Sequence, residues 1–351
     1  MEIKRKIMLK QIISIRGMGQ VLTVTCGLLV LCIVFGILNP NFYSAKNITN
    51  LLRQIAPFII VGIAQSYVLI TGNIDLSIGS VLGMSCMISA TLMTKGVDPW
   101  AASLITIIAC IATGVINGAL VSGFRLPPFI ATLGTMTVAR GVAQLVNNNM
   151  NTDAIGEGAQ AFRDFFYYGK TLSLYNTVWV ALALWLVFNF ILSQTKIGRH
   201  IYAIGSNIDA AKLSGVNAAY TTTVAYVVSA FCSGIAGLIT CAAGGLGTMD
   251  AGNSYEMYAV AAAVIGGIST LGGQGILLGT IVGACVWGVM QNGLQFVGAP
   301  VALRNIVIGI IVIVSVLTDV IIRSGKSKKS VARFLGVSLK NKTNQGGFGG
   351  V

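Results

Sequence analysis

The sequence predicts an all-α membrane protein with about ten transmembrane helices, some of them broken or re-entrant. Of its 351 residues, 55% are hydrophobic and only 9% are charged, and the mean hydropathy is +0.82. So few charged residues cannot cover the surface of a soluble globule of this size. They gather instead at the two ends and between long apolar runs, most of which approach the length needed to cross a hydrocarbon core of roughly 30 Å.

The apolar runs follow one another with polar breaks between them. Residues 1–19 hold five basic residues and precede the run 20–38, which is longer than a usual signal-peptide core and has no clear cleavage site. The stretch 51–93 is long enough for two helices and is broken at 72–80. Further spans are expected at 101–122, 129–146, 177–192, 221–243, 256–270, 275–296 and 303–322. The polar excursion after residue 146 is too long for a simple turn and is expected to fold on the surface.

The distribution of Lys and Arg predicts that both termini are cytoplasmic. Sixteen of the 23 basic residues fall in segments assigned to the inside and six in segments assigned to the outside. The Gly-rich tail, 323–351, holds seven of them and is expected to lie near anionic headgroups. The net charge of +13 does not indicate a nucleic-acid partner, because no basic face is interleaved with aromatic residues.

The longest interior polar stretch with a basic balance, 195–219, has three basic residues and one acid, which favours the cytoplasmic side. Ser206 and Asp209 are typical of a helix N-cap pair, and Gly215 of a left-handed C-cap. The expected short helix and its flanks comprise Ser206, Asn207, Asp209, Ala210, Ala211, Lys212, Ser214 and Gly215. A helix this small cannot stabilise itself in water, so it is either a contact for a cytoplasmic partner or an ordinary capped loop helix.

Several polar residues lie within or between the apolar runs. Asp75, beside Asn73 and Ser77, is a functional candidate because ionisable groups are costly at membrane depth, but a structural role as the cap of the following helix is favoured over it. Arg140 must meet a carboxylate, backbone carbonyls or water, either to hold the bundle or to face a pathway. The uncharged residues Gln65, Ser66, Asn117, Thr132, Thr135, Gln291 and Asn292 could line a pathway or make ordinary interhelical hydrogen bonds.

Glycine spacing indicates closely packed helices. Gly275, Gly279 and Gly283 recur every four residues, as do the pairs Gly79/Gly83 and Gly114/Gly118. The doublets at 266–267 and 272–273 flank a break that is expected at membrane depth, where irregular backbone must be buried in protein or line a cavity.

Motifs for chemistry on this chain are missing from the sequence. It has no G-x-x-x-x-G-K-[ST], H-E-x-x-H or G-x-S-x-G motif, and its one histidine, His200, stands alone. The seven cysteines are scattered through apolar runs, so we expect neither disulfides nor a metal site, and no cofactor bound by this chain. An ion-coupled secondary transporter would need buried carboxylates, for which only Asp75 and Asp319 are available.

Five collinear stretches resemble the ribose-type sugar permease subunits of ATP-binding-cassette (ABC) importers. They are GNIDLSIGSVLG (72–83), PPFIATLGTMTVARGV (127–142), TKIGRHIYAIGSNIDAAKLSGVN (195–217), YEMYAVAAAVIGGISTLGGQGILLGTIVGA (255–284) and NGLQFVGAP (292–300). The resemblance implies that 206–217 is the helix that inserts into an ATPase subunit, which binds ATP and Mg²⁺. It also implies a second permease chain and an external sugar-binding protein. This chain has Gly72-Asn73 where the family commonly has glycine or serine-glycine, and related permeases carry branched-chain amino acids or nucleosides.

Overall fold

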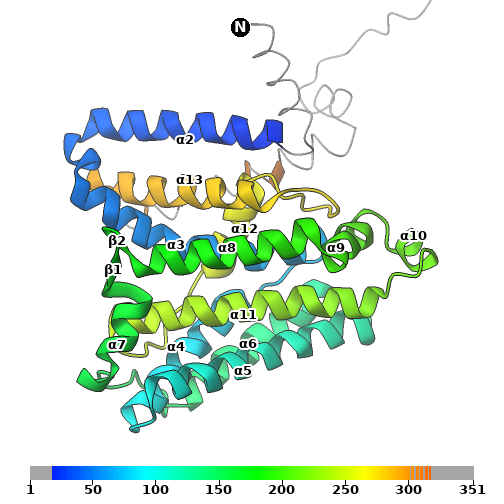
Figure 1. Ribbon diagram of the computed structural model, residues 1–351, viewed down its shortest axis with the longest axis horizontal. Coiled ribbons are helices and arrows are strands. Elements are labelled where there is room, and N and C mark those ends of the chain that lie inside the picture. Colours follow the sequence, from blue (N-terminus) through cyan, green and yellow to red (C-terminus); the bar gives the residue numbers. More distant parts are fainter. Residues whose placement is uncertain are drawn as a thin grey trace, which may run out of the picture.

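The computed structural model describes residues 18–300 and scattered positions between 302 and 317. The basic N-terminus, the tail 323–351 and most of the expected span 303–322 lie outside the described residues, so the predictions for them remain predictions. The long helices run side by side in one bundle (Figure 1). They are α2 (Met18–Leu38), α3 (Ala45–Ile70), α4 (Ile78–Thr94), α5 (Pro99–Gly118), α6 (Pro128–Leu145), α8 (Asn176–Gln194), α11 (Ala218–Gly244) and α13 (Leu277–Phe296), with the shorter α12 (Tyr255–Ile265) among them.

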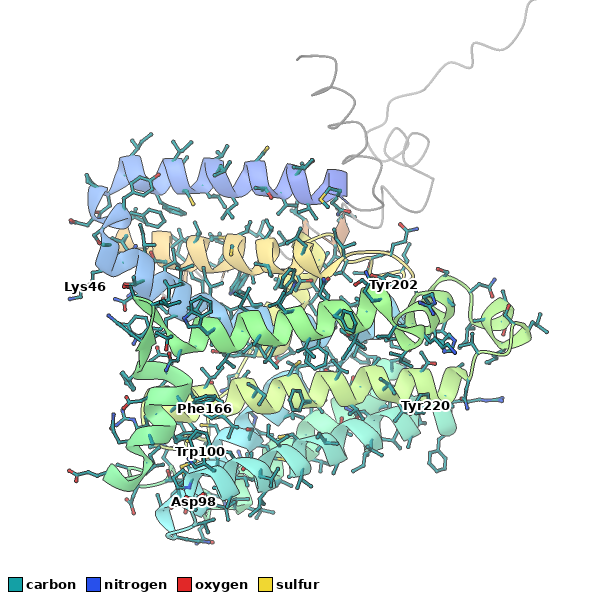
Figure 2. The ribbon with its side chains drawn as sticks, viewed as in Figure 1. Lys46, Asp98, Trp100, Phe166, Tyr202 and Tyr220 are labelled. Atoms are coloured by element: carbon teal, nitrogen blue, oxygen red, sulfur yellow. The ribbon has the colours of Figure 1, made fainter. Side chains whose placement is uncertain are left out.

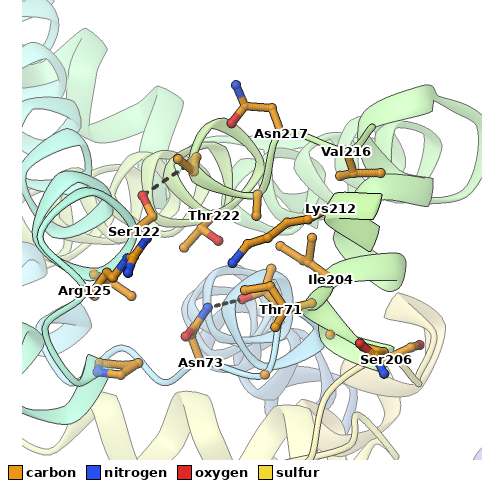
Figure 3. A pocket seen from close by; sticks show the side chains of 18 of the residues that line it. Thr71, Asn73, Ser122, Arg125, Ile204, Ser206, Lys212, Val216, Asn217 and Thr222 are labelled. Atoms are coloured by element: carbon orange, nitrogen blue, oxygen red, sulfur yellow. Dashed lines mark hydrogen bonds between the residues drawn. The ribbon is translucent and has the colours of Figure 1, made fainter. Parts of the chain in front are cut away.

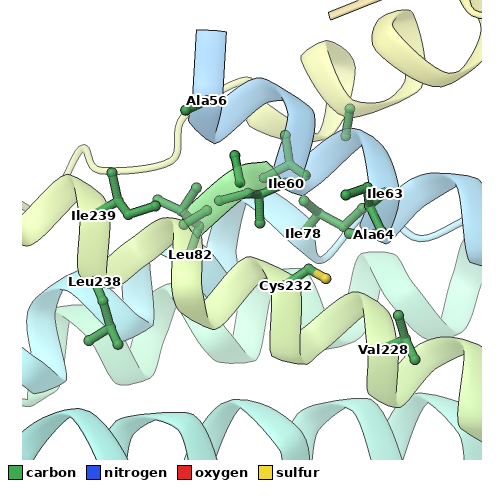
Figure 4. Packing of buried hydrophobic residues seen from close by; sticks show 14 of the residues in the cluster. Ala56, Ile60, Ile63, Ala64, Ile78, Leu82, Val228, Cys232, Leu238 and Ile239 are labelled. Atoms are coloured by element: carbon green, nitrogen blue, oxygen red, sulfur yellow. The ribbon is translucent and has the colours of Figure 1, made fainter. Parts of the chain in front are cut away.

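Helices α3 and α11 form the centre of the bundle. Helix α3 packs against α11, α12, α13 and α8, and α11 packs against α3, α4 and α5. Their shared core includes Ile60 and Ala64 of α3, Leu82 of α4, and Cys232 and Ile239 of α11, all of them buried (Figure 4). In contrast, only 11% of the residues in the most apolar stretch of α2 are buried, and only 22% of those in the most apolar stretch of α8, so these helices lie at the periphery.

Six helices in the described part are long and apolar enough to cross a membrane: α2, α3, α5 with its extension to Gly123, α8, α11 and α13. Helix α4 has 17 residues and α12 only 11. The prediction of a full span at 256–270 was wrong, because α12 ends at Ile265 and Gly267 turns the chain with φ +93°. Eleven helical residues cover about 16 Å, half of a hydrocarbon core.

The breaks predicted at 72–80 and 268–275 are both present. Helix α3 ends at Ile70 and α4 starts at Ile78, with irregular backbone between them. Gly275, predicted to share a helix face with Gly279 and Gly283, instead precedes α13 at φ +127°. The other two glycines do bring α13 close to α12, because a Cβ at either position would meet the backbone of Gly266 or Ala262.

The two ends of the bundle differ in character (Figure 2). One end, here called the hairpin end, carries Lys46, Asp98, Trp100 and Phe166; the other, the α10 end, carries Tyr202 and Tyr220. The hairpin end is built from η1 (Pro40–Tyr43), η3 (Glu157–Ala159), α7 (Gln160–Arg163), η4 (Asp164–Tyr168), β1 (Lys170–Thr171) and β2 (Leu174–Tyr175). The strands pair antiparallel, with Lys170 opposite Tyr175.

The excursion 147–175 folds onto this end, as predicted. The guanidinium of Arg53, near the start of α3, lies 4.4 Å from the ring centre of Tyr167 and 4.1 Å from that of Tyr175. Two such cation–π contacts fasten η4 and the hairpin to α3.

Candidate functional site

At the α10 end, two short helices join α8 to α11. Helix α9 (Lys196–Ser206) begins at Thr195, and α10 (Ile208–Leu213) follows it directly. The N-cap of α10 is Asn207, whose Oδ1 accepts hydrogen bonds from the backbone N–H groups of Asp209 (3.0 Å) and Ala210 (2.9 Å). The prediction of Ser206 as the cap was wrong, because Ser206 is the last residue of α9.

The end of α10 matches the prediction. Gly215 takes the left-handed conformation, with φ +82°, and its N–H donates to the carbonyl of Lys212 at 3.0 Å. Ser214, at the C-cap, donates its hydroxyl to the carbonyl of Ala210 at 2.9 Å. The free backbone groups at both ends of this six-residue helix are therefore satisfied by the helix and its flanking residues, so no other element has to cover them.

Helix α10 has two faces with different environments. Ile208 and Lys212 line a cavity beside the bundle, and Ala211 is buried. Asp209 and Leu213 do not line this cavity; each lies about 100° further round the helix than Ile208 and Lys212 respectively. Both are exposed, Leu213 to 91%. Sequence reasoning missed Leu213, although a leucine inside a short polar helix was a signal that could have been used. An apolar side chain this exposed at a capped helix marks a contact surface.

The end of α9 contacts both of the irregular breaks, 71–77 and 266–276, through backbone approaches so close that only glycine permits them. A Cβ on Gly205 would collide with the carbonyl of Ile70, the last residue of α3. The N–H of Gly273 donates to that same carbonyl at 2.8 Å, and a Cβ on Gly273 would fall 2.8 Å from the Cα of Ser206. We call this meeting of Ile70, Gly205, Ser206 and Gly273 the glycine junction.

Tyr202 of α9 strengthens the glycine junction. Its hydroxyl donates to the carbonyl of Gly275 at 2.7 Å. Helix α10 follows α9 with one residue between them, so α10 is connected through α9 and its close backbone contacts to the breaks at 71–77 and 266–276. Sequence analysis singled out the doublet 272–273 but not Gly205 or Tyr202.

A chain of hydrogen bonds crosses the bundle beside the first break. Thr135 of α6 donates to Asn117 Oδ1 at 2.7 Å, and Asn117 Nδ2 donates to the hydroxyl of Ser77 at 3.0 Å. Ser77 donates its hydroxyl to Asp75 Oδ1 at 2.6 Å, and Ser229 of α11 donates to Asp75 Oδ2 at 2.7 Å. The structure thus brings together four of the polar residues singled out in the sequence, as links between four segments: Asp75, Ser77, Asn117 and Thr135.

Both carboxylate oxygens of Asp75 accept hydrogen bonds in this network. Its Oδ1 also accepts the N–H of Ser77 at 2.9 Å, so the carboxylate holds the chain just before α4. The cap residue itself is Ser77, which makes no capping bond with its side chain. Asp75 is 2% exposed, and the three donors supply the compensation that a buried carboxylate requires.

Arg140 meets backbone carbonyls, one of the partners expected for it. Its Nη1 donates to the carbonyl of Met249 at 3.0 Å and to that of Ala251 at 2.7 Å. This contact ties α6 to the segment 245–254, which connects α11 to α12. Gly79 and Gly83 of α4 make room for that segment, since a Cβ on either would collide with the carbonyl of Gly252 or of Ala251.

The remaining predicted pathway residues are dispersed. Asn292 exchanges two amide hydrogen bonds with Asn47, at 3.1 and 3.2 Å, near the hairpin end. Thr132 bonds within its own helix, Asn73 lines the cavity beside α10, and Gln291 is half-buried. Gln65 of α3 differs from them, because it is completely buried and neither its amide nitrogen nor its amide oxygen has a hydrogen-bond partner in the structure.

A bundle of helices that includes six long and apolar enough to cross a membrane is the architecture of a multi-pass membrane protein. Residues 47–316 match the family described as the branched-chain amino acid transport system / permease component. The chain is 36% identical to the ribose import permease protein RbsC of Bacillus subtilis (strain 168), over 86% of this chain and 94% of that protein.

Two further relatives extend the comparison. The D-allose transport system permease protein AlsC of Escherichia coli (strain K12) is 32% identical, over 83% of this chain and 89% of its own length. The fructose import permease protein FrcC of Rhizobium meliloti is 35% identical, over 83% and 82% respectively. No solved structure matches the chain. The chain therefore belongs to this family of permease components of ABC importers and is a multi-pass inner-membrane protein.

Proposed function

We propose that this chain forms the translocation pathway of an ABC importer for a monosaccharide such as ribose or a related pentose or hexose. The observation that carries the proposal is the similarity, over more than four-fifths of the chain, to permeases named for ribose, allose and fructose. The description of the family favours branched-chain amino acids as the second candidate substrate class.

The proposal includes the topology and the partners. The chain crosses the membrane about ten times, one of these crossings being made by the half-length α12 together with the irregular segments on either side of it. Both termini then lie in the cytoplasm, so the α10 end is cytoplasmic and the hairpin end faces the external sugar-binding protein. A second permease chain completes the pathway. ATP and Mg²⁺ bind to a separate ATPase subunit, and this chain carries no cofactor of its own.

Coupling is proposed to run from α10 into the membrane breaks. The exposed face of Asp209 and Leu213 contacts the ATPase subunit, and movement of that subunit displaces α10. Helix α9 passes the displacement through the glycine junction to the breaks at 71–77 and 266–276. Because these two segments are not helical, they can change their dihedral angles with fewer lost helical hydrogen bonds than a continuous helix.

The occupied carboxylate of Asp75 supports ATP-driven rather than ion-coupled transport. Three donors already bond to its two oxygens, so a coupling ion would have to compete with them for this group. Among the predicted pathway residues, Gln65 has an amide whose donor and acceptor are both unused. We propose that this amide bonds to sugar hydroxyls when the pathway opens, because an unpaired buried amide otherwise only costs stability.

Reconstitution tests the proposal. The chain is placed in proteoliposomes with its ATPase subunit and binding protein, and uptake is measured for labelled ribose, allose, fructose and leucine. We expect ATP-dependent uptake of one or more of the sugars and none without the ATPase subunit. Uptake of leucine alone would select the second candidate, and sodium- or proton-driven uptake by the permease alone would contradict the proposal.

A further inference from the structure

A cavity of about 1040 Å³ opens beside α10. Its walls come from the first break (Thr71–Asn73), the π-helical turn and loop before α6 (residues 121–128), the end of α9 with α10, and the start of α11. Among the described residues that line it, two are basic, Arg125 and Lys212, and none is acidic. Figure 3 shows their side chains entering the cavity from opposite walls.

The backbone at Arg125 has an unusual conformation that its neighbours fix. Its φ of +59° lies in the left-handed region, which residues with side chains rarely adopt. The turns on either side are fixed, because the N–H of Phe124 donates to the carbonyl of Ala119 and that of Leu126 to the carbonyl of Leu120, both at 3.0 Å. Such conformations persist where the surrounding structure imposes them, and they concentrate at binding sites.

Lys212 lies on the cavity side of α10. It shares this side with Ile208, whereas Asp209, the only acid of α10, is exposed and is not part of the cavity lining. The other polar groups around the cavity are neutral, among them Asn73, Ser122 and Thr222. Two positive charges without a carboxylate in a concave space concentrate a positive potential there.

We propose that this cavity binds a small phosphate-bearing anion, held between the guanidinium of Arg125 and the ammonium of Lys212. The planar guanidinium fork matches the oxygens of a phosphate group, and lysine supplies a second, less directional charge. The neutral hydroxyl and amide groups can bond to the hydroxyls of a sugar phosphate, which the cavity is large enough to contain.

The position of the anion gives its binding a consequence. An anion that binds both Lys212 of α10 and Arg125 before α6 connects α10 to the bundle. Gly205 of the glycine junction also lines this cavity. Under the proposed function, on which this step rests, the bound anion restrains α10 and slows import. Accumulated phosphorylated product would then inhibit further uptake.

The test measures binding to the full-length chain in phosphatidylcholine nanodiscs by calorimetry, so it does not depend on transport. The probes are inorganic phosphate, a pentose phosphate and the same pentose without phosphate. The variants are Arg125→Gln and Lys212→Gln, and Arg199→Gln is the matched control, because Arg199 lies on α9 but does not line the cavity. We expect a phosphate-dependent affinity that each cavity variant lowers about tenfold or more and that the control leaves unchanged.

The outcomes separate the possible sources of the anion. Tighter binding of the pentose phosphate than of inorganic phosphate identifies a sugar phosphate, and equal binding identifies free phosphate; both support the site. If the soluble probes no longer bind in phosphatidylglycerol nanodiscs, and if this loss depends on Arg125, the site binds a lipid headgroup. That result also supports the site. The absence of phosphate binding, or equal binding by all variants, overturns the proposal.

Discussion

Replacing Asp75 by alanine tests whether this carboxylate holds the bundle together. The change removes the acceptor for the N–H and hydroxyl of Ser77 and for the hydroxyl of Ser229. Ser229 can turn its hydroxyl to a carbonyl of its own helix, as Ser233 does at 2.8 Å. The N–H of Ser77 keeps no such alternative, so we expect a loss of about 2–4 kcal/mol in the free energy of unfolding.

Asp75→Asn separates the structural role from a charge-carrying role. Asparagine retains one oxygen for Ser77, and its amide group can donate to the oxygen of Ser229, so the network survives with a loss of about 1 kcal/mol. We therefore expect Asp75→Asn to keep most of the wild-type uptake, whereas Asp75→Ala loses it together with stability.

The assay combines denaturant unfolding in mixed micelles with ATP-dependent sugar uptake in proteoliposomes. Ser233→Ala is the matched control, because its buried hydroxyl bonds only within α11, and we expect it to change stability by less than about 1 kcal/mol. An Asp75→Asn variant that is as stable as the wild type but inactive would refute the reasoning, because the charge itself would then be needed for transport.

Three further substitutions test separate parts of the account. Gln65→Leu removes an unpaired buried amide, so we expect a gain of about 1 kcal/mol in stability together with reduced uptake; reduced stability would show a structural role. Gly205→Ala forces the glycine junction apart, so we expect ATP hydrolysis to continue with little sugar uptake. The control Gly134→Ala, at a position with no neighbouring atom within 4 Å, should leave ATP hydrolysis and uptake unchanged. Arg140→Gln removes two charged hydrogen bonds, and we expect faster hydrogen exchange in 245–254 and a loss of about 2–4 kcal/mol; unchanged exchange would contradict the contact.

Apolar run length predicted most helices of the bundle because a membrane span leaves a strong, local signal. The limits of α2, α6 and α11 came within about three residues of the observed ones. The same signal failed at 256–270, where composition does not reveal that Gly266 and Gly267 stop a helix halfway. Hydropathy reports whether the side chains of a segment favour lipid or water. The length of a helix also depends on the backbone angles at its ends.

The candidate site was predictable only where its contacts are local. The left-handed Gly215 follows from neighbours along the chain, and Asn207 was recognised as part of the region although the cap was assigned to Ser206. The glycine junction joins Ile70, Gly205 and Gly273, which are far apart in sequence, so no local pattern could reveal it. The network around Asp75 has the same origin, since its distant donor, Ser229, lies 154 residues away.

The central claim is that α10 is the cytoplasmic contact through which an ATPase drives transport, and a pair of leucine substitutions tests it most directly. Leu213→Asp on α10 and Leu172→Asp on the hairpin make the same chemical change at side chains that are 91% and 81% exposed. In proteoliposomes with the ATPase subunit and binding protein, we expect Leu213→Asp to lower ATP-dependent sugar uptake about tenfold or more and to weaken ATPase binding. Leu172→Asp should leave ATPase binding intact. Normal uptake by Leu213→Asp, or loss of ATPase binding in Leu172→Asp, would contradict the account.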